Sequence, residues 1–216
     1  MVTDAMGKGP HMESPFLRPD HRDYAEILTD ATIHVHGARG IDRWSVRALA
    51  RWMKVVPAVV LNDYSRARVL AIVIICFERR WLAWSGSEPL YGSSSTDLPL
   101  RLPETEDERL GVRVLTSLQQ LAEAERLRGD GAPAAHLDRL RREEAELLRY
   151  RLRVLGDRCG SPPVGAASLT ATVALITGLR LALAEPAPTL TYPLACELLA
   201  AHVERLFGGA REEAAS

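Results

Sequence analysis

The chain has 216 residues and a formal net charge of −1, with 47% hydrophobic and 25% charged residues. A chain of this size can bury one sizeable core, or two small ones, without disulfides or metal. Its three cysteines are not closely spaced, which excludes a disulfide framework and a CxxC zinc site, and its charge excludes a wholly basic nucleic-acid coat. The longest uninterrupted apolar run, Val69 to Phe77, is far shorter than the roughly 20 residues of a membrane span, and no signal-like segment begins the chain. We therefore expect a cytoplasmic protein.

Charge is distributed unevenly along the sequence. Residues 21–84 carry ten Arg or Lys against six Asp or Glu, a net of +4, whereas residues 85–216 carry fifteen against nineteen, a net of −4. A basic N-terminal third is typical of a nucleic-acid-binding head on a larger body. Random variation of a solvated surface would produce a difference of the same size, so charge alone leaves both interpretations open.

The N-terminal residues predict an arm followed by short helices. Residues 1–20 are rich in Gly and Pro and have no apolar periodicity, so we expect a disordered arm. A first helix begins near His21, and we expect Gly37 and Gly40 to end it. Ser45 is a natural N-cap for a short second helix.

Two apolar stretches are ambiguous between strand and helix. Residues 55–61 have high β-propensity, yet Pro57 is unsuited to a central strand and suits the first turn of a helix. The run from Val69 to Phe77 is apolar on every side and follows a potential N-cap at Ser65. It predicts a fully buried fourth helix that extends to about Trp84.

The rest of the chain predicts four more helices. A loop rich in Ser, Gly and Pro at 85–103 precedes acidic residues that begin a helix at 104–107, and a leucine stripe at 137–155 marks the next one.

Two apolar helices end the chain. Leu169 to Ala184 is nearly all apolar and is interrupted by Gly178 and Arg180. The last helix, Tyr192 to Phe207, should end at the glycine pair that follows it, which leaves a flexible tail at 209–216. Outside the two ambiguous stretches nothing indicates a sheet, so the predicted fold class is all-α.

The order of these helices and the residues of the N-terminal third resemble the TetR/AcrR family of bacterial regulators. Ser45-Val46-Arg47-Ala48-Leu49-Ala50 matches the family's capped "x-R-x-[IL]-A" string without a gap. Lys54-Val55-Val56 stands where the family has a Gly-Val-Ser turn. Ala174 to Leu179, followed by Ala184-Glu185-Pro186, is similar to the family's eighth helix, and Leu194 to Phe207 is similar to its ninth.

This resemblance implies an N-terminal helix-turn-helix head at residues 21–65 and a larger helical effector-binding and dimerisation domain at 66–208. It implies a homodimer that binds a palindromic operator in double-stranded DNA, responds to a small-molecule effector and acts as a repressor. The last two helices would form the dimer interface, through Leu169, Val173, Ile176, Leu183, Leu194, Leu198 and Phe207.

The head departs from the family pattern where the family contacts DNA. Lys54 replaces the turn glycine, Val56 replaces a hydroxyl cap, and Asp63 stands at a family histidine, with the wrong charge beside phosphate. The expected DNA-binding residues are Ser45, Arg47, Lys54, Pro57, Asn62, Arg66 and Arg68. Two hypotheses follow: a repressor that binds DNA through these residues, or a TetR-like protein without operator binding. The second would act through its effector pocket, as a small-molecule-binding protein or an enzyme.

The body carries no pattern specific for catalysis. No spacing of His, Cys, Asp or Glu demands a metal or pairs a nucleophile with a base, so we expect no catalytic residue, metal or cofactor. The charged residues at 141–146 are interpreted as a solvated helix face. Arg180 lies either at the rim of a dimer interface or beside a carboxylate. The candidate ligand-pocket residues are Trp81, Trp84, Tyr150 and Arg180.

Overall fold

The computed structural model describes residues 24–39, 44–61, 65–86 and 100–213. Within these ranges the chain forms helices and no strand, which confirms the all-α prediction. The predictions for the arm at 1–20, for Gly40, for Asn62 and Asp63, and for most of the 85–103 loop lie outside the described residues. The helices are α1 (Tyr24–Arg39), α2 (Val46–Trp52), α3 (Pro57–Leu61), α4 (Arg66–Gly86), α5 (Glu106–Leu127), α6 (Ala132–Arg158), α7 (Ala166–Ala184) and α8 (Tyr192–Glu213).

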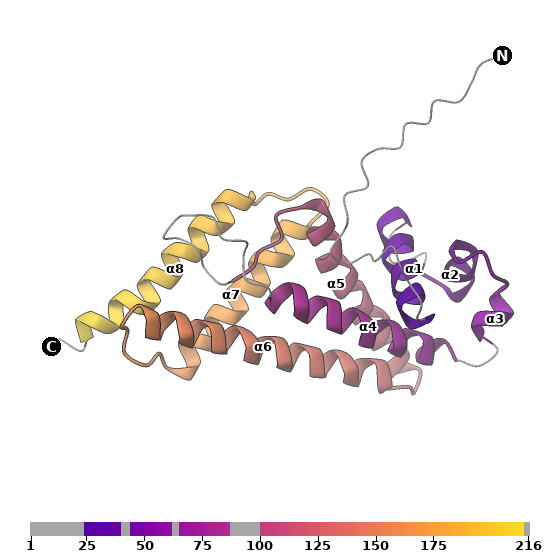
Figure 1. The fold of residues 1–216 in the computed structure, drawn as a ribbon, viewed down its shortest axis with the longest axis horizontal. Coiled ribbons are helices and arrows are strands. Elements are labelled where there is room, and N and C mark those ends of the chain that lie inside the picture. The colour runs from indigo at the N-terminus through magenta and orange to yellow at the C-terminus, as the bar shows by residue number, and fades with distance from the viewer. Residues whose placement is uncertain (1–23, 40–43, 62–64, 87–99, 214–216) are drawn as a thin grey trace, which may run out of the picture.

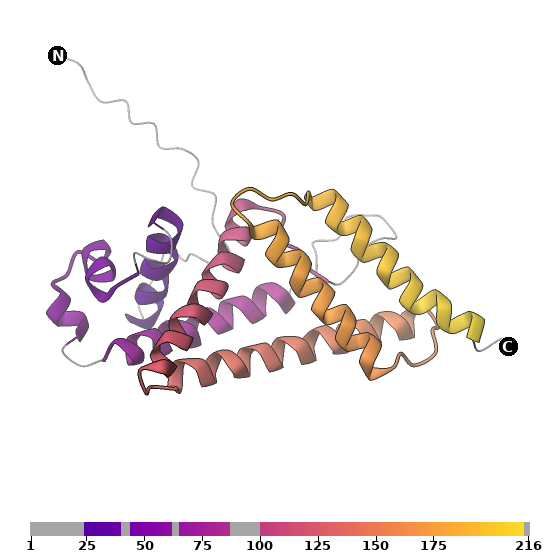
Figure 2. The same ribbon diagram turned by 180° about the vertical axis from the view of Figure 1, so that it is seen from behind.

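The molecule is elongated, with the three short helices at one end and α8 at the other (Figure 1). The long helices α4 and α6 run along its length and pack against each other. Seen from behind, α7 lies between α5 and α8 and contacts both (Figure 2). The body is therefore a bundle of α4 to α7, extended by α8.

The short helices form where their caps predict. The Ser45 hydroxyl accepts a hydrogen bond of 3.1 Å from the Ala48 amide and so caps α2, as predicted. The ambiguous stretch at 55–61 contains a helix that begins at Pro57. Proline at a first helical position loses no hydrogen bond, since that amide has no partner inside the helix. This local effect outweighs the β-propensity of the neighbouring valines.

Three helix boundaries differ from the sequence prediction: the end of α1, the start of α7 and the end of α8. Helix α1 continues through Gly37 to Arg39. A Cβ on Gly37 would lie 3.2 Å from Leu110, so this glycine permits the close approach of α1 to α5 and does not end the helix. Helix α7 begins at Ala166, one turn earlier than predicted.

At the C-terminus the glycine pair does not stop the last helix. Helix α8 passes through Gly208 and Gly209 and ends at Glu213, so the predicted helix end at the glycine pair is wrong. Each glycine costs a helix only about 1 kcal/mol relative to alanine. The good helix formers that follow, Ala210 to Glu213, offset part of that cost.

The predicted cap of α4 is present, and α5 begins within the predicted acidic segment, at a threonine cap that the sequence prediction did not include. Ser65 accepts a hydrogen bond of 3.2 Å from the Arg68 amide at the start of α4. Thr105 caps α5 and forms a reciprocal capping box with Glu108. The ambiguous run at 69–77 lies within α4 and is largely buried, as expected for an apolar segment covered on several sides.

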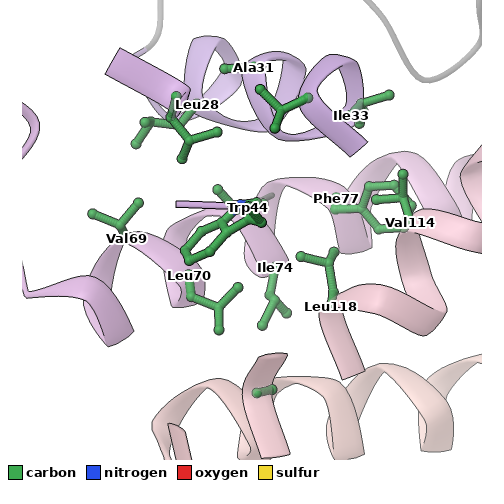
Figure 3. Close-up of a cluster of buried hydrophobic side chains, with 14 of the residues drawn as sticks. Leu28, Ala31, Ile33, Trp44, Val69, Leu70, Ile74, Phe77, Val114 and Leu118 are labelled. Atoms are coloured by element: carbon green, nitrogen blue, oxygen red, sulfur yellow. The ribbon is translucent and has the colours of Figure 1, made fainter. Parts of the chain in front are cut away.

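Two apolar clusters hold the fold together. The first joins α1, α4 and α5, where Leu28, Ile74, Phe77 and Leu118 are almost inaccessible to solvent (Figure 3). The second joins α6, α7 and α8. Because the first cluster continues from α1 into α4 and α5, the head and the body share a core.

Helix α7 is long and apolar enough to span a membrane by length and composition alone, and about a third of it is buried within the protein. It packs against α5, α6 and α8 and carries the buried Arg180. These contacts are those of a core helix in a helical bundle.

Candidate DNA-facing head and ligand cavity

Four of the predicted DNA-binding residues lie on the described part of α2, the turn and α3. Arg47 and Lys54 expose their side chains to solvent, and Pro57 is exposed at the first position of α3. Ser45 is half-buried, and its hydroxyl is engaged as the α2 cap. Two cations of the turn region are therefore accessible, while the serine serves the fold.

The turn between α2 and α3 requires a left-handed residue. Lys54 has φ of 56°, and no other non-glycine residue in the described ranges has a positive φ. Such a conformation costs a side-chain-bearing residue roughly 1 kcal/mol and is natural for glycine. The backbone thus keeps the geometry of a glycine turn although the sequence has lysine there.

Arg66 and Arg68 lie in the first turn of α4. The Arg66 Nε lies 3.0 Å from an Oε of Glu125, a largely buried carboxylate near the end of α5, and its guanidinium stands over the Trp44 ring at 5.3 Å. Arg66 therefore ties the head to the body, a role that the sequence did not suggest. Arg68 is exposed on the same turn.

A cavity of about 390 Å³ lies between α4, α5, α6 and α7. Its size falls in the range of small-molecule sites. The helices contribute mostly apolar side chains and a few polar ones: Trp81, Val112, Leu115, Thr116, Gln119, Leu140, Arg141, Glu144, Ala145, Leu148, Val173, Thr177, Arg180 and Leu181.

Arg180 is buried in the cavity wall and pairs with an internal carboxylate. Its Nη1 lies 2.5 Å from Glu144 on α6, its Nε donates to the Arg101 carbonyl at 2.9 Å, and its Nη2 donates to the Ser85 hydroxyl at 3.1 Å. Burial lowers the pKa of the Arg180 guanidinium, and the charge of Glu144 opposes that shift. Glu144 is thus part of a buried pair, so its assignment to a solvated helix face was wrong.

The two predicted tryptophans lie together beside this pair. The ring centroids of Trp81 and Trp84 are 4.9 Å apart, and the Arg180 guanidinium lies over both rings. Only Trp81 lines the cavity. The Trp84 indole instead donates a 3.0 Å hydrogen bond to Glu108, so it supports the wall from behind.

Glu108 is the carboxylate that organises this supporting layer. It accepts hydrogen bonds from Trp84, from Arg101 and from the backbone amides of Glu104 and Thr105. Burial alone would raise the pKa of Glu108, but these hydrogen bonds outweigh burial and lower it. The start of α5 is therefore held by a charged group that stays ionised.

Tyr150 does not belong to this site. It lies on α6 with 63% of its surface exposed, and it is not among the residues that line the cavity. The sequence reasoning missed Gln119, Thr116 and Thr177, which do line it. Their signal was the interruption of the apolar faces of α5 and α7 by polar residues at helical spacing.

The residues predicted for the dimer interface divide into two groups. Leu169, Ile176, Leu183 and Phe207 are buried within the single chain, in the cluster of α6, α7 and α8, and Val173 lines the cavity. Leu194 and Leu198 on α8 are exposed. The sequence could not separate the two groups on α7, because a helix that is apolar on every side gives no periodicity to distinguish its core face from its outer face.

A buried ion cluster joins the head to the body. Arg80 on α4 pairs with Glu26 and, at 2.5 Å, with Asp30, both on α1. Arg80 and Asp30 are almost completely buried. Further along α1, His36 is hydrogen-bonded to Ser117 on α5. The head is thus held by polar contacts from α1 to both α4 and α5, as well as by the shared core.

The arrangement of these helices matches solved structures of bacterial regulators. A transcriptional regulator from Rhodococcus sp. Rha1 superposes with a TM-score of 0.65 at 18% identity, covering 87% of this chain and 98% of that one. A protein described as a TetR-family transcriptional regulator from Rhodococcus sp. gives a TM-score of 0.62 at 16% identity, over 85% and 97% of the two chains. The chain has the TetR-type fold.

A transcriptional regulator from Pseudomonas aeruginosa PAO1 gives a TM-score of 0.61 at 18% identity, over 88% of this chain and 92% of that one. No family model matches the sequence. No curated protein matches it either. At these identities the TetR-type likeness is a likeness of fold.

Proposed function

We propose that this protein is a cytoplasmic, ligand-responsive transcriptional regulator of TetR type, a repressor that binds operator DNA as a homodimer. The observation that carries the proposal is the helical geometry of the head. A capped α2, a left-handed turn at Lys54 and a short α3 form a helix-turn-helix on a body that contains a cavity of ligand size. Three neighbours of this fold are described as transcriptional regulators.

Exposed cations on the head support DNA binding. Arg47, Lys54 and Arg68 have exposed side chains that suit phosphate contacts, while the exposed Val56 offers only an apolar contact of the kind made to a thymine methyl. We therefore expect binding that depends steeply on salt and is only modestly selective for sequence.

DNA binding is tested by fluorescence anisotropy on the region upstream of the protein's own gene, at two salt concentrations. Arg47→Ala should weaken binding and flatten the log–log salt slope by about one unit. Arg153→Ala is the matched control, because Arg153 is exposed on the C-terminal third of α6, away from the head. Absence of wild-type binding at low salt, with the protein folded, would refute the DNA-binding part.

Exposed faces on the last two helices support the homodimer. On α7 and α8 these faces carry small and apolar residues: Ala167, Ala171, Ala174, Gly178 and Leu181, and Leu194, Leu198 and Ala201. Leu198→Glu should produce a folded monomer in analytical ultracentrifugation, because Leu198 is 46% exposed and contributes little to the single-chain core. Leu127→Glu, at an even more exposed leucine on α5, should leave the assembly unchanged.

One observation favours the alternative that the protein acts through its cavity alone. Arg66, expected at a phosphate, is instead engaged with Glu125 and Trp44. A protein without operator binding would show no wild-type anisotropy change and would still bind a ligand in the cavity. The two functions are therefore separated by the same DNA titration.

A further inference from the structure

The charges in the cavity wall compensate each other. Arg180 and Glu144 form a pair at 2.5 Å, and the remaining edges of the guanidinium meet the Arg101 carbonyl, the Ser85 hydroxyl and the tryptophan rings. Arg141, the other charged lining residue, is exposed and lies 3.6 Å from Asp138. The buried part of the wall therefore offers no counter-charge to an ionised ligand.

The hydroxyl groups in the wall are oriented as acceptors. Thr116 donates to the Val112 carbonyl at 3.1 Å, and Thr177 donates to the Val173 carbonyl at 3.0 Å. A hydroxyl has one proton and two lone pairs, so each threonine retains only acceptor capacity toward the cavity. The Gln119 side chain adds an amide that can both donate and accept.

Apart from these groups and the indole N–H of Trp81, the lining is apolar. Leucine and valine side chains from α5, α6 and α7 and the Trp81 ring provide most of the surface. A ligand that buries apolar area against this surface binds more tightly, and one that brings a polar group without a hydrogen-bond partner binds more weakly.

We propose that the ligand of this cavity is an uncharged, mainly apolar molecule that donates hydrogen bonds from hydroxyl or N–H groups to Thr116 and Thr177. This inference rests on the proposed function, in which the cavity is the effector site. An ionised carboxylate or ammonium would lie buried beside a pair that is already neutralised. A ligand without a donor would cover the threonine oxygens and leave their acceptor capacity unused.

The test uses three aromatic probes of similar shape and the full-length protein without DNA. The probes are β-naphthol, which is neutral and carries a donor; its methyl ether, which is neutral and carries none; and β-naphthoate, which is ionised near neutral pH. Isothermal titration calorimetry should show the naphthol binding roughly five- to tenfold more tightly than the methyl ether, the effect of one neutral hydrogen bond. The naphthoate should bind at least about a hundredfold more weakly than the naphthol.

Threonine variants test whether the difference in affinity between naphthol and its methyl ether depends on Thr116 and Thr177. Thr116→Val with Thr177→Val should remove the preference for naphthol and leave the affinity for the methyl ether unchanged. Thr170→Val is the matched control, since Thr170 makes the same bond to its own helix from an exposed position on α7. Thermal unfolding reports whether each variant folds, and the single Thr177→Val variant serves the same purpose if the double variant does not fold.

Several results would overturn the inference. These are naphthoate binding as tight as that of naphthol, equal binding of naphthol and its ether, a preference that survives the threonine variants, or no binding of any probe. Because no DNA is present, failure here is distinguishable from failure of the regulator proposal. A protein that binds its upstream DNA but none of the probes would refute this ligand class alone.

Discussion

The buried ion cluster between α1 and α4 allows a quantitative prediction. Arg80→Met keeps the length of the side chain and removes its charge. Asp30, which is 2% exposed, would then lose its 2.5 Å contact with Arg80, and Glu26 would lose the two hydrogen bonds that Arg80 donates to its Oε2. We expect the substitution to destabilise the protein strongly, because the penalty comes from carboxylates left behind in a low-dielectric environment.

The expected loss follows from the burial of both partners. Removing one member of a buried ion pair costs about 3–5 kcal/mol, whereas breaking an exposed pair costs less than about 1 kcal/mol. Arg126→Ala provides the exposed reference, since both Arg126 and its partner Glu123 lie largely in solvent. The difference between the two variants should therefore be about 2–5 kcal/mol.

Urea unfolding followed by tryptophan fluorescence measures these free energies. A second substitution distinguishes a stranded charge from lost packing. Arg80→Met combined with Asp30→Leu leaves less unpaired charge and should recover a large part of the stability. If Arg80→Met costs no more than Arg126→Ala, or if Asp30→Leu adds to the damage in the Arg80→Met background, the account of a stranded buried carboxylate is wrong.

Three further predictions concern the turn, a half-buried histidine and two glycines. Lys54→Gly should raise the free energy of unfolding by about 0.5–1 kcal/mol, because the turn already has the left-handed φ that glycine adopts freely, and urea unfolding measures it. Burial lowers the pKa of His36 in the folded protein, so as the pH drops through the ordinary value of 6.5 the unfolded chain binds more protons than the folded one. The free energy of unfolding should therefore fall as the pH drops through 6.5. His36→Gln should reduce this fall, which unfolding experiments across about pH 7 to 5 measure. Gly156→Ala should destabilise the protein by about 1–2 kcal/mol, since the added Cβ would lie 2.9 Å from the Phe207 ring. Gly178→Ala should not lower the thermal stability of the monomer, because the added Cβ would meet no atom within 4 Å in the single chain.

The parts of the fold that the sequence predicted are those that depend on near neighbours. Ser45 and Ser65 each cap a helix through a backbone amide three residues ahead, so the capping residue and its partner appear together in the sequence. The helical class follows from the same local patterns. Glycine was the less reliable signal, because Gly37 serves a close helix contact and Gly208 lies within a helix.

The candidate site was predicted only in part because its partners are distant in sequence. Arg180 was recognised as unusual, but its partner Glu144 lies 36 residues earlier in a run of charges that looks solvated. Trp84 was grouped with Trp81, although its indole turns to Glu108 and away from the cavity. Such pairings depend on how helices pack, and that packing has no local signature.

Helix α4 is where the cavity and the head meet. Trp81 lines the cavity, and the preceding residue, Arg80, holds α1 through Glu26 and Asp30. Adjacent residues on a helix point about 100° apart, so one rigid segment borders both sites. Under the proposed function, a ligand that displaces Trp81 must shift α4 or repack around it, and a shift of α4 carries the buried ion cluster and α1 with it. Because separating a buried pair is costly, the ion cluster gives the head a reason to follow a movement of α4.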